Sequence, residues 1–277
     1  MKKIGWIILL VVLGASVSQA QGRSDLIDLL RLSKFKCTAE SSIDPVTTCI
    51  GLISGYSQKV RIYIPKSYEA QNLTTLNIHF HGWRLDGVDT FKVNKSDLQG
   101  WGDYAARLAE SGSSELLIIP ESIGHCSTYK TELTGIGKFE QFVTEIKKNI
   151  GAKEDLLIGL SGHSGAGRVI DLILGSLRTN QSSLINQIYK IGFFDAVYDD
   201  LPNFRALVSS TREVSYSVSY LANGSTQSYT TNLKKLLANN VAKVKFSGVP
   251  ASKLGPLYDH MMNMNLGGFS NFLSLSK

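Results

Sequence analysis

The stretch 155–178, with the sequence DLLIGLSGHSGAGRVIDLILGSLR, limits what this chain can fold into more than any other part of it. An apolar run of strand length, 156–160, is followed by a cluster of small residues, and apolar side chains then recur at helical spacing as far as Leu177. We therefore predict a strand, a tight turn and a helix. In that setting a G-x-S-x-G type sequence has a mechanical role, because small flanking residues allow a sharp turn that exposes one serine hydroxyl.

Two serines compete for the tip of this turn. Ser161 lies in the sequence GLSGH, and Ser164 lies in GHSGA. We favour Ser164 as a nucleophile, because the helix begins directly after it whereas Ser161 still belongs to the end of the strand. The fifth position of the pattern is Ala166 instead of glycine, but alanine is small enough for close packing of strand and helix. The alternative is a strand–helix turn that has small residues and no chemistry.

The N-terminus has the pattern of a secretory signal peptide. Two lysines precede an apolar run, 4–14, and small residues, 18–20 (SQA), follow it. The run is too short to span a bilayer well, and no second run of this length follows. We expect a signal peptide over 1–20 and a single domain over 21–277, secreted or periplasmic, with no stable membrane anchor after cleavage.

The charge of the chain is mildly positive. The formal net charge is +6, and +4 remains without the two lysines of the signal. The basic residues are scattered, with no run longer than a pair. Solvated faces account for such charges, so we expect no nucleic-acid partner.

Three cysteines are present: Cys37, Cys49 and Cys126. In an exported protein Cys37 and Cys49 can close a short loop as a disulfide, which would leave Cys126 over. Pairings through Cys126 and three free thiols are the alternatives. The chain has no C-x-x-C sequence, so a zinc ribbon or a thioredoxin-like motif is not supported.

Segments with strand and helix patterns alternate along the mature chain. We expect strands at 58–65 (half-exposed, because apolar and polar residues alternate), 73–80, 115–119, 156–160, 189–194, 214–221 and 241–246. We expect helices at 24–34, 101–111, 139–150, after residue 164, at 203–210 and at 231–239. The alternation predicts an α/β fold: a mostly parallel central sheet with helices on both faces, and an antiparallel hairpin at its N-terminal edge.

Residues suited to hydrolysis follow several of these strands. In a parallel sheet, chemistry gathers at the carboxyl ends of the strands. The chain presents Ser164, Asp195 and His260 there, in that order. This order, the turn at Ser164 and the pair His81-Gly82 at the end of an early strand resemble the α/β-hydrolase superfamily, from about residue 58 to the C-terminus. The resemblance implies an esterase-like serine hydrolase and does not specify the substrate.

In this resemblance His260 is the base and Asp195 the acid that orients it. Asp195 directly follows an apolar strand, where a carboxylate has no packing role, whereas Asp199 and Asp200 are expected to be solvated. Many members of the superfamily carry the acid one strand later, where this chain has Asn223. The assignment of the acid is therefore less direct than that of the nucleophile.

Two backbone N–H groups should hold the oxyanion of the tetrahedral intermediate. The resemblance assigns them to Gly165 and Trp83, with Gly82 providing the unusual backbone geometry. His79 and His81 share one face of a strand, but no third ligand accompanies them, so we expect no metal and no cofactor. A nucleophilic Cys126 paired with the adjacent histidine would lack a turn to hold it.

The sequence thus predicts an exported serine hydrolase that cleaves a carboxylic ester through an acyl-enzyme intermediate. Its partner would be a small-molecule or polymer-derived acyl substrate. One alternative is an amidase or peptidase that acts on cell-wall or peptide material. Another is a non-catalytic binding protein with an α/β-hydrolase-like fold, suggested by Ala166 in the turn and by Asn223 at the later strand.

Overall fold

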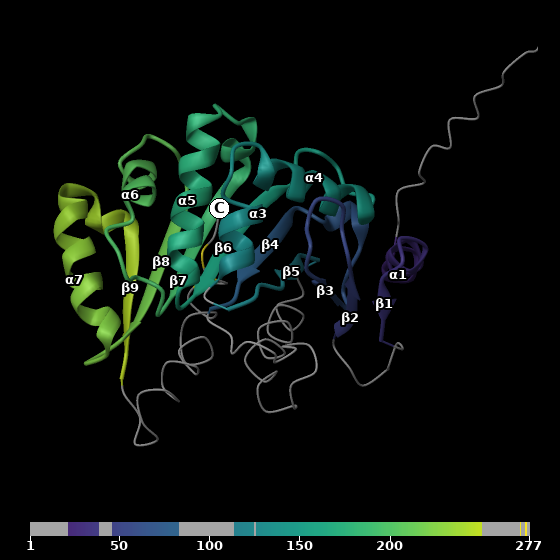
Figure 1. The fold of residues 1–277 in the computed structure, drawn as a ribbon, viewed down its shortest axis with the longest axis horizontal. Coiled ribbons are helices and arrows are strands. Elements are labelled where there is room, and N and C mark those ends of the chain that lie inside the picture. Colours follow the sequence, from purple (N-terminus) through teal and green to yellow (C-terminus); the bar gives the residue numbers. More distant parts are fainter. Residues whose placement is uncertain are drawn as a thin grey trace, which may run out of the picture.

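The computed structural model describes residues 22–38, 46–82, 114–124, 126–250, 272 and 275. In these ranges a nine-stranded sheet has the order β1-β2-β3-β5-β4-β6-β7-β8-β9 (Figure 1). The strands are β1 (Lys36–Cys37), β2 (Val46–Gly51), β3 (Val60–Pro65), β4 (Thr75–Phe80), β5 (Leu116–Pro120), β6 (Leu157–His163), β7 (Ile188–Phe194), β8 (Ser215–Leu221) and β9 (Val244–Val249). The helices are α1 (Arg23–Leu32), α3 (Ser127–Glu132), α4 (Lys138–Asn149), α5 (Ala166–Thr179), α6 (Pro202–Val208) and α7 (Ser225–Leu237).

The sheet is parallel over most of its width. β4 pairs in parallel with both β5 and β6, and parallel pairing continues from β6 through β7 and β8 to β9. The pairs β1–β2, β2–β3 and β3–β5 are antiparallel. The predicted α/β fold is therefore confirmed, with the antiparallel strands at the N-terminal edge. The carboxyl ends of the parallel strands, where the candidate residues lie, share one edge of the sheet.

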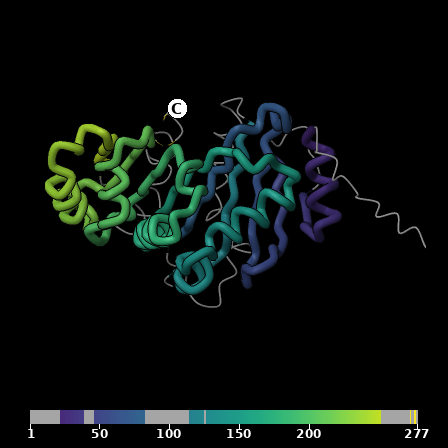
Figure 2. The backbone as a smooth tube through the Cα atoms, turned by 90° about the horizontal axis from the view of Figure 1, so that it is seen from above, coloured from purple at the N-terminus to yellow at the C-terminus, as the bar shows by residue number. Residues whose placement is uncertain are grey.

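The helices bury apolar stripes against the sheet. α4 and α5 lie in front of the strands in Figure 1, and their apolar residues, spaced by three and four, belong to one large core cluster with the sheet. α1 lies beside β1 at the N-terminal edge (Figure 2). Within the described ranges, no helix combines the length and apolarity needed to cross a membrane.

A second, smaller cluster covers the opposite face of the sheet. It consists of Tyr63, Leu117, Ile119, Phe194 and Phe272. Phe272, from the C-terminal end of the chain, packs edge-on against Phe194 with ring centroids 6.0 Å apart. The helix predicted at 101–111 lies outside the described residues.

The prediction that β3 is half-exposed was wrong, because all six of its residues are buried. β3 lies between β2 and β5 instead of at the edge of the sheet, so both of its faces are covered. Two of its polar side chains bind each other in the interior: Nη1 of Arg61 donates a hydrogen bond to the Tyr63 hydroxyl over 2.9 Å.

Two helix predictions also differ from the structure. α7 begins at Ser225, six residues before the predicted start. The prediction missed the first part of this helix because that part is polar and lacks an apolar stripe. α3 lies between two predicted elements, the strand at 115–119 and the helix at 139–150, where we predicted no helix. Such a short helix has too few residues to show a period.

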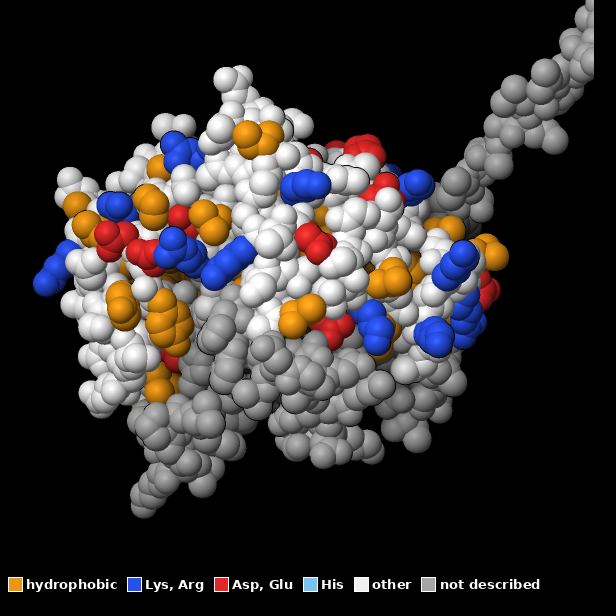
Figure 3. Space-filling model, in the orientation of Figure 1, with side chains coloured by type: hydrophobic (Ala, Val, Ile, Leu, Met, Phe, Trp, Pro, Cys, Tyr) orange, Lys and Arg blue, Asp and Glu red, His pale blue; other side chains and the backbone are white. Residues whose placement is uncertain are grey.

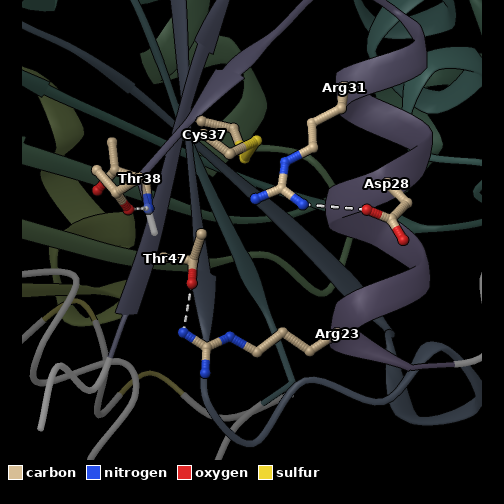
Figure 4. Close-up of a disulfide and its surroundings, with 8 residues drawn as sticks. Arg23, Asp28, Arg31, Cys37, Thr38 and Thr47 are labelled. Atoms are coloured by element: carbon tan, nitrogen blue, oxygen red, sulfur yellow. Dashed lines mark hydrogen bonds and ion pairs between the residues drawn. A yellow bond between two sulfur atoms is a disulfide. The ribbon is translucent and has the colours of Figure 1, made fainter. Parts of the chain in front are cut away.

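The cysteine pairing is settled at the N-terminal edge. Cys37 and Cys49 are register partners in β1 and β2 and form a disulfide (Figure 4). Figure 4 also shows Arg23 of α1 donating to the Thr47 hydroxyl of β2, so the helix and the hairpin are joined by polar contacts as well. Cys126 is a free, buried thiol.

Charged side chains are mixed over the face that carries α4 and α5. In Figure 3, Lys and Arg side chains lie beside Asp and Glu side chains, and no large patch of one sign is visible on this face. This agrees with the scattered basic residues of the sequence.

Candidate active site

Ser164 lies in the turn between β6 and α5. Its φ is +54°, in the left-handed region that non-glycine residues rarely adopt. Ser161 instead lies inside β6, fully buried, with its Oγ 2.9 Å from Nδ1 of His79 on the neighbouring strand β4. Of the two serines in the motif, Ser164 is therefore the one that the strained turn presents.

Small residues allow this turn, but not quite at the positions that the motif indicates. A Cβ on Gly167 would lie 1.9 Å from the carbonyl oxygen of Ala196, which follows β7. A Cβ on Gly162 would lie 2.9 Å from Ile170 Cδ1 and 3.2 Å from Ala166 Cβ. The close approaches thus fall on Gly162 and Gly167, and Ala166, fully buried, occupies the space that Gly162 leaves. The imperfect fifth position is compatible with a closely packed turn.

The turn after β4 lies directly against Ser164. A Cβ on Gly82 would lie 2.5 Å from Ser164 Cβ and 3.0 Å from the carbonyl oxygen of His163. His81 holds this turn: the Ser122 N–H donates to its Nε2 over 2.9 Å, so the ring proton is on Nδ1, which donates to the Gly82 carbonyl over 2.8 Å. His81 is therefore a neutral, structural histidine and does not serve as a base.

Asp195 leaves the sheet next to Ser164. The β6–β7 register pairs His163 with Phe194, and the Ser164 N–H donates to the Phe194 carbonyl over 3.2 Å. The Asp195 side chain is buried, with 2% of the residue exposed. The nucleophile candidate and the acid candidate thus follow adjacent parallel strands.

The carboxylate of Asp195 is fixed by the strand and helix that come next. Its Oδ1 accepts hydrogen bonds from the Leu221 N–H, over 3.0 Å, and from the Thr226 hydroxyl. β8 therefore supplies one donor to Asp195, and α7 supplies the other. Thr226 is a residue that the sequence did not single out, since nothing in its local pattern marks it.

The carboxylates of Asp199 and Asp200 bind other side chains. Asp199 forms an ion pair with Arg168, with 2.8 Å between Oδ2 and Nη1. Asp200 is exposed and accepts a hydrogen bond from Asn232. Both carboxylates are exposed, whereas Asp195 is buried.

A cavity of about 410 Å³ opens at Ser164. It is lined by Cys126, Lys130, Ser164, Gly165, Arg168, Ala196, Tyr198 and Asp199. Burial raises the pKa of the Cys126 thiol to about 11, and the positive charge of Lys130 opposes the rise. A thiol with this pKa is almost fully protonated at neutral pH, so Cys126 is poorly suited to act as a nucleophile.

Tyr198 is a second residue that lies at the site and was not among the residues predicted for it. Burial raises the pKa of its phenol, the negative charge of Asp195 adds to the rise, and hydrogen bonding with the side chains of Ser164 and Ser225 opposes it. The phenol therefore stays protonated at neutral pH and lies within reach of Ser164.

The structure brings together three of the five residues predicted for the site. Ser164 and Gly165 line the cavity, and Asp195 follows the strand adjacent to β6. His260 and Trp83 lie outside the described residues, and so does His125. The base and the second oxyanion donor remain predictions.

The sequence matches no known protein family, and no curated protein is significantly similar to it. Solved structures are similar in fold. S-formylglutathione hydrolase from Agrobacterium tumefaciens is 11% identical with a TM-score of 0.52, over 86% of this chain and 100% of that chain. The Staphylococcus aureus S-formylglutathione hydrolase is 11% identical with a TM-score of 0.54, over 86% and 100%.

A ferulic acid esterase from Anaeromyces mucronatus is 16% identical with a TM-score of 0.53, over 85% of this chain and 92% of that chain. Structural similarity at such low sequence identity is evidence for the fold alone. Together with the sheet order and the turn at Ser164, it shows that this chain has the α/β-hydrolase fold.

Proposed function

We propose that the protein is an exported serine hydrolase that cleaves a carboxylic ester, with Ser164 as its nucleophile. One observation carries the proposal. Ser164 is held in a left-handed turn at the mouth of a cavity, with Gly82 against it and buried Asp195 after the adjacent strand. A serine hydroxyl needs this kind of surrounding, because it is a poor nucleophile without a base and an oriented partner.

In the proposed reaction the Ser164 oxygen attacks the carbonyl carbon of the ester while His260 takes the hydroxyl proton. Asp195 orients the imidazole and stabilises its positive charge. The N–H groups of Gly165 and Trp83 donate to the oxyanion, and the N-terminus of α5 adds favourable potential there. The bond to the alcohol then breaks, the alcohol leaves with the proton from His260, and water releases the acid from the acyl-enzyme by the same steps.

The comparisons support ester cleavage as the reaction, since the similar structures are, by name, two S-formylglutathione hydrolases and a ferulic acid esterase. Export is supported by the signal-like N-terminus and by the disulfide, because structural disulfides persist in oxidising compartments. We place the mature protein outside the cytoplasm, as one domain over 21–277.

A fluorophosphonate probe tests the proposal. It should label the wild-type protein and the Ser161→Ala variant, and it should fail to label Ser164→Ala. Absence of labelling in well-folded wild-type protein would favour a non-catalytic binding protein instead. A nitrophenyl ester and its matched anilide, compared in the same assay, separate an esterase from an amidase or peptidase.

A further inference from the structure

Among the described residues that line the cavity at Ser164, positive charges outnumber negative charges. Lys130 from α3 and Arg168 from α5 line it, and Asp199 is the carboxylate among the lining residues. Asp199 is already paired with Arg168, with 2.8 Å between their charged atoms. Within the described part of the chain, the ammonium of Lys130 has neither an ion pair nor a hydrogen bond, so its charge is uncompensated.

The two cations lie close to where the ester would react. Lys130 is near enough to the Cys126 thiol to affect its ionisation, and a Cβ on Gly165 would lie 3.7 Å from Cys126 Sγ. Lys130, Cys126 and the proposed oxyanion donor Gly165 line the same cavity. Arg168 lies one helical turn after Ser164 and keeps further N–H donors, since its ion pair uses Nη1.

The lining is unusual for a site that takes a neutral, lipid-like acyl chain. Small-ligand pockets are mostly apolar, with few polar groups placed for orientation. Of the eight described residues that line the cavity here, three are charged, and the volume of about 410 Å³ lies near the lower end of the range for such pockets. A short substrate with a negative group would be attracted by Lys130 and would find donors on Arg168.

We propose that the substrate is a small ester that carries an anionic group, such as a carboxylate, close to the scissile carbonyl, and that Lys130 and Arg168 bind this group. The inference rests on the proposed function, since it concerns the substrate of the same site. It names the charge of the substrate and leaves the reaction unchanged.

Paired esters that differ only in charge test the inference. Nitrophenyl hemiadipate and its methyl ester place the carboxylate on the acyl side, and meta-acetoxybenzoate and its methyl ester place it on the leaving group. In at least one pair, kcat/KM should favour the anionic ester by about fivefold, the scale of a partly exposed ion pair. Lys130→Gln should bring that ratio close to one, and Lys148→Gln, on the exposed side of α4, should keep it.

Salt gives a second readout. The preference of the wild-type protein should weaken as ionic strength rises, because exposed charges are screened. If both pairs show equal kcat/KM, or if Lys130→Gln keeps the preference, the inference is overturned while the esterase function stands. If no ester is hydrolysed and the fluorophosphonate does not label Ser164, the function itself fails, and this inference fails with it.

Discussion

Replacing Gly82 by alanine places a methyl group against the proposed nucleophile. The new Cβ would lie 2.5 Å from Ser164 Cβ and 3.1 Å from Ser164 Oγ, whereas ordinary contact begins near 3.4 Å. The turn after β4 or the turn at Ser164 must therefore move by about 1 Å, because the packed interior leaves no free space. The carbonyl of His163, 3.0 Å from the same methyl, blocks the shortest relief.

A displacement of about 1 Å between reacting groups lowers kcat/KM by roughly 100-fold, equal to about 2.7 kcal/mol of transition-state stabilisation. Overpacking of this kind also lowers the free energy of unfolding by about 1–3 kcal/mol, so the variant should still fold. Steady-state hydrolysis of a nitrophenyl ester and urea unfolding measure the two effects separately. The control is Gly22→Ala, since a Cβ there meets nothing within 4 Å.

A folded Gly82→Ala variant whose kcat/KM stays within about twofold of the Gly22→Ala control would contradict this prediction. That result would mean that the turn after β4 does not approach the reacting atoms as the structure shows.

Three further predictions concern hydrogen bonding, ionisation and the disulfide. Thr226→Val removes a donor to the Asp195 carboxylate and should lower kcat/KM by about tenfold, since hydrogen bonds to charged groups contribute roughly 1.5–3 kcal/mol. Thr230→Val on the same helix is the control, because the Thr230 hydroxyl is buried with no hydrogen-bond partner in the described part of the chain. An equal loss of kcat/KM in the two variants would contradict a special role for Thr226. Iodoacetamide should modify native Cys126 very slowly at pH 8, because only about one thiol in a thousand is ionised there at a pKa of about 11, and the rate should increase as pH rises. Mass spectrometry measures the extent of alkylation. Rapid alkylation of the folded protein would contradict the burial of Cys126. Reducing the disulfide between β1 and β2, which are joined over a sequence separation of 12, should lower the free energy of unfolding by about 3 kcal/mol in urea titrations, and an unchanged midpoint would count against that contribution.

The fold was predictable where local pattern decides it. The periodicity of 155–178 predicts β6, the turn and α5, and the alternation of strands and helices predicts a parallel sheet. The burial of β3 was not predictable in the same way. Its alternating residues look half-exposed, and only the sheet order, which places β2 and β5 on its two sides, explains why Arg61 and Tyr63 are buried.

The candidate site also contains residues that local sequence predicts and residues that only the tertiary structure brings together. Ser164 was predicted because it lies in a turn of small residues directly before a helix, and Asp195 because it directly follows an apolar strand. Both are local signals. The fit of Gly82 against Ser164 depends on β4 and β6 being neighbours, although they are far apart in the chain. Thr226 and Tyr198 reach the site through contacts between elements, and no sequence period reports such contacts.

The central claim, that Ser164 carries the acyl group during hydrolysis, can be tested directly. The protein is mixed with nitrophenyl acetate, quenched in acid within the first turnover, digested and analysed by peptide mass spectrometry. We expect one acetyl group on Ser164, present in Ser161→Ala and lost together with hydrolysis in Ser164→Ala. An acetyl group on another residue, or wild-type rates of hydrolysis by Ser164→Ala, would contradict it.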